Sequence, residues 1–202
     1  DYEALSYFTE FWPSDNTDPI ERLFIQWGFS QVFPAKTMCA HVTTWNKNSS
    51  VKFRTDVAMM CKLGFDIKLA DMSKDDETYC RTAVQNYNRL KPVVLEGDMY
   101  RLVSPYGSNH TSTMYVGKDK DKAVVFAFDI HPRYAEKTLP VRLQGLDADK
   151  MYRVKEINLM PGANSSLSGN GEVFSGEFLM NVGLNLFTTQ QLNSRVVEVV
   201  AE

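Results

Sequence analysis

The stretch "FTEFWPSDNTDPIERLFIQWG", Phe8 to Gly28, joins an aromatic segment to an amphipathic one. Residues 7–12 are rich in aromatic side chains, which is typical of a strand, and Pro13 ends the run. Asp18-Pro19-Ile20-Glu21 follows, with an acidic N-cap, proline at the first helical position and glutamate three residues after the cap. The stretch therefore predicts a strand, a loop and then a helix, whose apolar stripe is Ile20, Leu23, Phe24 and Trp27.

The same order of strand and helix recurs twice in the rest of the first half. Residues 37–44 and 65–70 are predicted strands; a helix expected to end at Gly64 follows the first, and a helix capped by Ser73 and ending near Pro92 follows the second. Such alternation predicts parallel strands joined by helical crossovers. About eight such units close a barrel of roughly 250 residues. Three units leave apolar surface uncovered, so the chain is expected to be the end of something larger.

The pattern changes from about residue 98. Short segments with period-two features alternate with turn-rich pieces, which predicts an antiparallel sandwich of about six or seven strands. Residues 160–176 are expected to form a long loop. The predicted strands are residues 99–103, 111–117, 123–130, 139–146, 151–157, 183–187 and 194–200.

Composition excludes several classes of function. The 202 residues are 44% hydrophobic, enough for one large domain or two small ones, and a net charge of -3 gives no basic patch for nucleic acid. No apolar run approaches the roughly 20 residues that cross a bilayer, so no membrane partner is expected. No cofactor or metal site is expected, because His41, His110 and His131 do not group with one another or with cysteines. The odd, widely spaced Cys39, Cys61 and Cys80 predict buried thiols.

Candidate catalytic groups remain only among the acids of the first stretch. The chain has no G-x-S-x-G elbow, phosphate loop or H-E-x-x-H helix. Glu10, Asp15 and Asp18 follow a predicted strand, where barrel enzymes place catalytic groups. Asp18 has a sufficient structural role as N-cap, and it could also pair with Arg22. Asp15 has no such role, and flanking rings could desolvate it; a solvated turn residue is the alternative that position alone leaves open.

The strings "WPSDNTDPIERLFIQWGFSQVFP" and "MCAHVT" resemble glycoside hydrolase family 36, the retaining α-galactosidases. The family pattern is close to W-T-S-D-x-T-D-x-x-E-R-L-x-I-Q-x-G-x-S, followed by Y-P and M-G-A-H-V-S. The likeness continues through "RTDVAMMCKLGFDIKL", "GDMYRLVSP" and "LMNVGLNL", and so covers most of the chain. It implies an α+β chain: residues 1–97 would be the last three β/α units of a TIM-like barrel, and residues 98–202 an antiparallel β-sandwich domain.

The resemblance also implies a role for Asp15, which falls on the general acid/base of the S-D-x-T-D motif. A retaining mechanism needs a second carboxylate as nucleophile, about 5 to 5.5 Å away. In the family that nucleophile belongs to a K-x-D-x-N motif, which does not occur here; nor does the C-x-S-G-G sugar-binding loop. The full-length protein is thus expected to hydrolyse terminal α-D-galactosyl residues of melibiose- or raffinose-type oligosaccharides, and the 202 residues alone to be inactive.

Three further side chains are candidate sugar contacts: Trp12, Trp45 and His41. Trp12 lies beside Asp15 in the sequence and could contact the sugar; the alternative is that it packs in the barrel core. Trp45 could stack on a sugar ring, or it could pack against its own domain. For His41, on a predicted strand, a hydrogen-bonded structural histidine is the alternative. Trp45 belongs to "TTWNKN", residues 43–48, which replaces the P-N-H-Q stretch that the family tends to have and leaves substrate preference open.

The missing nucleophile motivates a function of another class. The chain could be a noncatalytic module derived from such an enzyme, which binds carbohydrate or supports oligomer contacts. Because the family is often oligomeric, the resemblance also allows a homo-oligomer of the full-length enzyme. No compartment signal is present, and a bacterial protein of the cytoplasm or periplasm is the expectation.

Overall fold

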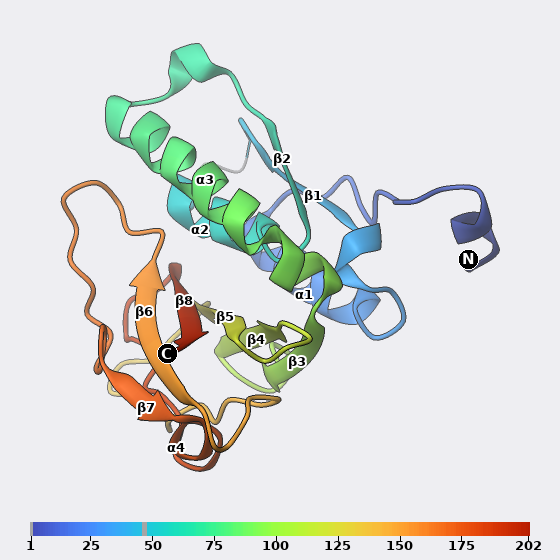
Figure 1. The fold of residues 1–202 in the computed structure, drawn as a ribbon. Coiled ribbons are helices and arrows are strands. Elements are labelled where there is room, and N and C mark those ends of the chain that lie inside the picture. Colours follow the sequence, from blue (N-terminus) through green and yellow to red (C-terminus); the bar gives the residue numbers. More distant parts are fainter. Residues whose placement is uncertain (1, 46–47) are drawn as a thin grey trace.

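The computed structural model describes residues 2–45 and 48–202, and two regions follow one another along the chain (Figure 1). We name residues 2–97 the β/α region and residues 98–202 the sheet region. The β/α region contains η1 (Tyr2–Ser6), α1 (Pro19–Phe29), η2 (Ala35–Thr37), β1 (Cys39–Thr43), α2 (Val51–Ala58), β2 (Lys62–Asp66), η3 (Leu69–Asp71) and α3 (Lys74–Glu96). The sheet region contains β3 (Asp98–Val103), β4 (His110–Val116), β5 (Lys122–Asp129), β6 (Met151–Ile157), β7 (Val173–Ser175), α4 (Gly176–Asn181) and β8 (Asn193–Ala201).

The β/α region is built on parallel pairing. β1 pairs with β2 in parallel, from Cys39 opposite Lys62 to Thr43 opposite Asp66. Phe11 adds one parallel bridge to Met38, immediately before β1. The strand predicted for residues 7–12 is therefore reduced to a single bridge, because η1 occupies the preceding residues and Pro13 has no N–H to continue a ladder.

Two helix ends differ from the prediction. α2 ends at Ala58, and Gly64 lies inside β2, opposite His41. Residues 59–63, between Ala58 and Gly64, are mostly apolar, which is compatible both with the end of a helix and with the start of a strand. The hydrophobic periodicity therefore could not show where the helix ends and the strand begins. α3 continues through Pro92 to Glu96. Pro92 is exposed, so water can satisfy the carbonyl group that its missing N–H leaves unpaired.

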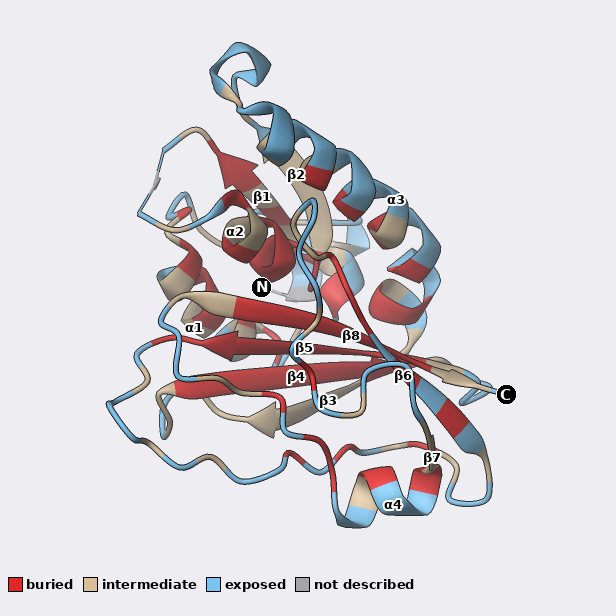
Figure 2. Ribbon diagram, turned by 90° about the vertical axis from the view of Figure 1, so that its left-hand side faces the viewer, coloured by how far each residue is buried: buried red, intermediate tan, exposed pale blue. Residues whose placement is uncertain are grey.

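The sheet region is one six-stranded antiparallel sheet in the order β3-β4-β5-β8-β6-β7. Figure 2 shows its central strands in the buried colour, with helices above and loops and α4 below. One face packs on the helices of the β/α region; Phe53 of α2, for example, meets Phe128 of β5 edge to face at 5.6 Å between ring centroids. The other face packs on a second core that includes Leu143, Leu179 and Leu184. The chain is thus a mixed α/β structure with an antiparallel sheet.

The layer over the second face is not a regular sheet in the described residues. Residues 139–146 and 183–187, both predicted as strands, are joined by one bridge between Val141 and Leu184. Val141 and Leu143 in the first segment, and Leu184 and Leu186 in the second, are buried against the sheet, whereas Leu139 is exposed. The period-two pattern of these segments therefore reflects burial and not strand pairing. Conversely, β7 and α4 begin within or directly after the predicted loop 160–176, where Ser175 caps α4 by accepting from Phe178 N at 3.1 Å.

Buried polar contacts join the two regions. Asp56 of α2 is fully buried and accepts hydrogen bonds from Ser194 Oγ (2.7 Å) and Asn158 Nδ2 (3.1 Å) of the sheet region. On its own side it accepts from Tyr79 Oη (2.8 Å) and pairs with Lys52 (2.5 Å). This cluster, which we name the Asp56 clamp, fixes the helices on the sheet.

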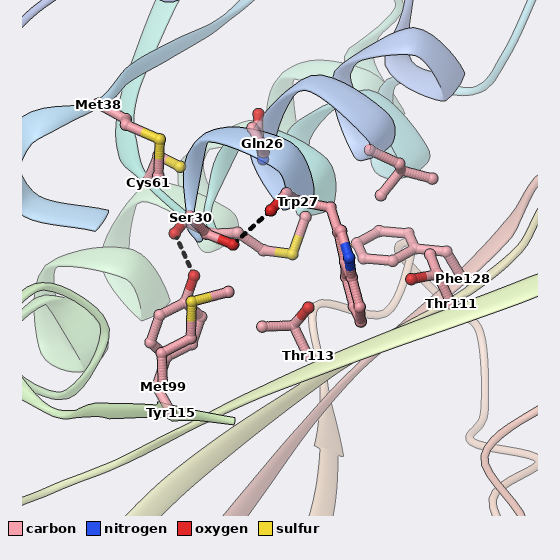
Figure 3. A pocket seen from close by; sticks show the side chains of 12 residues that line it. Gln26, Trp27, Ser30, Met38, Cys61, Met99, Thr111, Thr113, Tyr115 and Phe128 are labelled. Carbon is pink, nitrogen blue, oxygen red and sulfur yellow. Dashed lines mark hydrogen bonds between the residues drawn. The ribbon is translucent and has the colours of Figure 1, made fainter. Parts of the chain in front are cut away.

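A small cavity of about 10 Å³ lies between α1 and the sheet (Figure 3). Tyr115 of β4 donates to the backbone carbonyl of Met60 beside it, at 2.7 Å. Cys61 lines the cavity, and full burial raises the pKa of its thiol to about 12, so it stays protonated and unreactive. The volume admits at most one water molecule, so we treat the cavity as a packing gap.

Candidate active site

The loop of residues 12–18 lies between the Phe11 bridge and α1, at the carboxyl end of the parallel strands. Asp18 is the N-cap of α1, where its Oδ1 accepts from the backbone N–H groups of Ile20 (3.0 Å) and Glu21 (3.1 Å). Asn16 Oδ1 accepts from Asp18 N at 2.9 Å, and Ser14 Oγ accepts from Asn16 N at 3.1 Å. Short side-chain-to-backbone bonds therefore give the loop around Asp15 a defined shape.

Arg22 holds this loop from beneath, and sequence reasoning missed that role. The predicted pair with Asp18 does not form: the Arg22 side chain turns inward, is buried, and donates to the carbonyl oxygens of Ser14 (3.2 Å) and Cys39 (3.0 Å). Burial lowers the pKa of the guanidinium, although arginine remains charged in proteins. Asp18 is engaged by the helix N-terminus instead. The predicted apolar stripe gave no signal of this role, because Arg22 follows Ile20 by two residues and so lies on the other side of the helix from the stripe.

Asp15 is exposed at the tip of the loop. Within residues 2–45 and 48–202 its carboxylate has no hydrogen-bond partner in the protein. The carboxylate of Asp18, three residues later, accepts hydrogen bonds from the backbone of α1. The desolvation by flanking rings that the sequence suggested is therefore absent from this chain. Its carboxylate is free to meet a ligand.

Trp12 and His41 form a ring pair beside the loop. Their ring centroids are 4.0 Å apart and the planes are inclined by 41°. Trp12 is 47% exposed, whereas His41 on β1 is half-buried and its Nδ1 has no hydrogen-bond partner among the described residues. Burial, followed by the nearby Arg22 charge, lowers the pKa of His41, while Asp66 and Asp15 oppose that shift. His41 is therefore neutral at pH 7, with both carboxylates close enough to act on it.

Trp45 is 66% exposed and lies just beyond the end of β1. Arg54 of α2 supports this segment by donating to the carbonyl of Thr43 at 2.7 Å and, more weakly, to that of Trp45 at 3.4 Å. No ring contact between Trp45 and Trp12 is found in the described part of the chain. Residues 46 and 47 of the "TTWNKN" stretch lie outside the described residues.

The three acids of the opening stretch do not form one cluster. Glu10 forms a hydrogen-bonded ion pair with Lys62, which lowers the pKa of Glu10. Lys62 begins β2, so this pair lies at the amino end of the parallel strands, whereas Asp15 follows the opposite end. Asp18 is a cap. Asp15 is the one member of the three that combines exposure with a free carboxylate, and it can exchange a proton with a ligand held beside Trp12 and His41.

Two family models match this chain. Residues 1–97 match the Melibiase model, and residues 110–199 match the glycosyl hydrolase family 36 C-terminal domain. The first match ends with the β/α region, and the second begins at β4 of the sheet region.

The similar proteins are α-galactosidases. "Alpha-galactosidase 2" of Hypocrea jecorina is 35% identical over 96% of this chain and 25% of its own length. The crystal structure of the family 36 α-galactosidase AgaB from Geobacillus stearothermophilus matches with a TM-score of 0.88 and 28% identity, covering 100% of this chain and 27% of that one. A variant of AgaA from the same organism, solved in complex with raffinose, matches over 100% of this chain and 27% of its own, with a TM-score of 0.87 and 27% identity. The chain spans about a quarter of the length of these relatives.

Proposed function

Since this chain belongs to glycoside hydrolase family 36 and corresponds to its C-terminal part, we propose that it is part of a retaining α-galactosidase that hydrolyses terminal α-D-galactosyl residues. The substrates would be oligosaccharides of the melibiose and raffinose type. Support comes from the related AgaA variant, which was solved with raffinose.

Asp15 is the proposed general acid/base, and one observation carries the assignment. It is the exposed, free carboxylate of the "SDNTD" motif, held at the carboxyl end of the parallel strands by Asp18, Asn16 and Arg22. In the first step, protonated Asp15 gives its proton to the glycosidic oxygen as the nucleophile attacks the anomeric carbon. In the second, the Asp15 carboxylate takes a proton from the water that releases galactose.

The nucleophile is proposed to come from residues outside these 202. We therefore expect no turnover by this chain alone, and closure of the site by further strands would also provide the desolvation that Asp15 lacks here. In this proposal residues 1–97 are the last three β/α units of a (β/α)8 barrel. Residues 98–202 form the C-terminal β domain, in which residues 139–146 and 183–187 provide the second layer of a sandwich-like core.

Trp12, Trp45 and His41 are proposed sugar contacts of different strength. Trp12 and His41 are supported by their ring pair beside the loop of Asp15. Trp45 is supported only by its exposure at the end of β1. A homo-oligomer of the full-length enzyme remains part of the proposal, and sedimentation would test it.

The acid/base role is tested by leaving-group dependence in a polypeptide that includes the rest of the barrel. Asp15→Ala should reduce turnover of raffinose, whose leaving group is the poorly acidic alcohol sucrose, by about 100- to 10,000-fold, the usual contribution of general acid catalysis. Turnover of an activated dinitrophenyl α-galactoside should fall far less in its first, bond-breaking step. Asp149→Asn, which changes an exposed carboxylate in a turn of the sheet region, is the matched control. Unchanged raffinose turnover in Asp15→Ala would refute the assignment.

A further inference from the structure

A second pocket of about 600 Å³ lies wholly within the sheet region. It is bounded by the end of β3, by residues 136–144 and by the segment after α4. Its volume falls within the roughly 300–1,000 Å³ typical of sites for small ligands. No residue of the proposed active site contributes to its lining.

A buried histidine, held by a buried aspartate, lines this pocket. His110 of β4 is 2% exposed and its Nδ1 lies 2.8 Å from Asp129 Oδ1. Asp129 also accepts from Thr188 N (3.1 Å), Thr188 Oγ1 (2.6 Å) and Asn193 Nδ2 (3.0 Å). These contacts fix the position of the Asp129 carboxylate and of the His110 ring. Because Asp129 engages Nδ1, Nε2 is the ring nitrogen left for another partner.

The other polar anchor is Glu136, whose Oε1 is 3.8 Å from His110 Nε2. Its carboxylate is held by the backbone N–H of Arg133 (2.8 Å) and by Asn109 Nδ2 (3.2 Å), and these bonds lower its pKa. Glu136 is therefore an acceptor at neutral pH. His110 Nε2 is buried and has no hydrogen-bond partner within residues 2–45 and 48–202. The 3.8 Å between these two groups is too long for a direct hydrogen bond, so the histidine nitrogen that faces Glu136 in the pocket is left for a ligand.

The chemistry of the lining selects the kind of ligand. The Glu136 carboxylate requires a hydrogen-bond donor and its negative charge disfavours an anion, whereas His110 Nε2 needs a hydrogen-bond partner of its own. Lys137 and Arg142 also line the pocket and disfavour a cation. Leu139, Val182 and Phe187 supply apolar walls, and the Phe187 ring lies 4.6 Å from the His110 ring. Neutral molecules that carry several hydroxyl groups on a partly apolar ring meet all of these conditions.

We infer that this pocket is a second carbohydrate site, in which hydroxyl groups of a mono- or disaccharide donate a hydrogen bond to Glu136 and form another with His110 Nε2. A hydroxyl group both donates and accepts, and neighbouring hydroxyls of one sugar can reach both anchors. The site is independent of the proposed hydrolysis, because it uses none of the residues around Asp15.

Titration of the protein with galactose and with raffinose tests the inference, with calorimetry for affinity and NMR of ¹⁵N-labelled histidine for location. We expect saturable binding that shifts the Nε2 signal of His110 and that persists in Asp15→Asn. The second site would be overturned if neither galactose nor raffinose bound. Binding that leaves the His110 signal unchanged would overturn it as well. An ordered water molecule as the sole occupant would give that negative result. Neither outcome bears on hydrolysis, which the leaving-group experiment tests separately.

Two variants make the test specific. Glu136→Gln replaces the charged acceptor by a neutral amide; binding should weaken by at least about tenfold, the loss expected for a charged hydrogen bond, while the thermal midpoint is kept. Val182→Trp fills the pocket from an exposed position and should have the same effect. Glu172→Gln, an exposed carboxylate outside the pocket, is the control. Binding that survives both pocket variants would contradict the proposal.

Discussion

In the sheet region, β4, β5 and β8 are buried along nearly their whole length, whereas β2 of the β/α region is only half-buried. The difference follows from what covers each sheet. The six-stranded sheet has a core on both faces. β1 pairs with β2 on one side, and on the other side the one bridge within residues 2–45 and 48–202 joins Phe11 to Met38, just before β1. The proposed catalytic residue Asp15 therefore lies in the β/α region, whose strands are less buried, and most of the buried apolar side chains lie in the sheet region.

The comparison teaches that helices connect the loop of Asp15 to the sheet region. α2 packs on β8 and on α1, and buried Gln26 of α1 donates to the carbonyl of Val57 in α2 at 3.0 Å. Arg22 then ties α1 to the loop. The stability of the sheet region is thus linked to the geometry of the loop through α2, α1 and Arg22 in turn. The following substitutions each change one part of this connection or of the packing of one region.

Asp56→Ala should have the largest effect, because it removes the centre of the Asp56 clamp. Lys52 would lose its buried partner, and Tyr79, Asn158 and Ser194 would lose an acceptor. We expect a loss of about 3–5 kcal/mol in the free energy of unfolding, as for other broken buried ion pairs. Urea denaturation measures it. Asp75→Ala, an exposed acid at the start of α3, should change the midpoint little, and an equal effect of both would contradict the clamp.

A pair of identical truncations compares the two cores directly. Leu143→Ala empties a position that is 1% exposed beneath the sheet and should cost about 2–5 kcal/mol. Leu63→Ala, in half-buried β2, should cost less than half as much because less apolar area is lost. Denaturant midpoints of the two variants give the answer. Equal losses would mean that the β/α region is as well packed as the sheet region.

Asp18→Ala removes the cap of α1 and should cost about 1 kcal/mol. Asp18→Asn keeps a good capping side chain and should be nearly neutral, which separates the cap from the charge. Thermal unfolding of both variants distinguishes them. If Asp18→Asn were as damaging as Asp18→Ala, the charge of Asp18 rather than its hydrogen bonds would matter.

The smallest effect concerns His41. Its folded pKa is lowered below the unfolded value of about 6.5, so the stability it contributes is present above that pH and is lost as the pH falls through the folded pKa. Asp15 raises this pKa, so Asp15→Asn should lower it further. NMR titration of His41 in both proteins measures the change. A pKa that does not move would show that Asp15 and His41 do not interact.

Much of the local structure could be predicted from the sequence. Asp18, Pro19 and Glu21 predict the start of α1, and Ser73 predicts that of α3, because a cap bonds within its own turn. Alternation of strands and helices predicts the parallel pairing of β1 with β2. The ends of α2 and α3, and the strand status of residues 139–146 and 183–187, could not be predicted. An apolar period reports which side is buried, but not whether a neighbouring backbone is there to pair.

The sequence by itself determined the family, the helix caps and the motif that contains Asp15, because each depends on residues close together in the chain. Only the tertiary structure decided that Arg22 turns inward to hold the loop, that Trp12 meets His41, and that Glu10 lies at the opposite end of the strands from Asp15. The pairing of His110 with Asp129 and Glu136 also required it. Each of these contacts joins separate elements or loops, and the sign of each interaction depends on burial and distance, which no local pattern encodes.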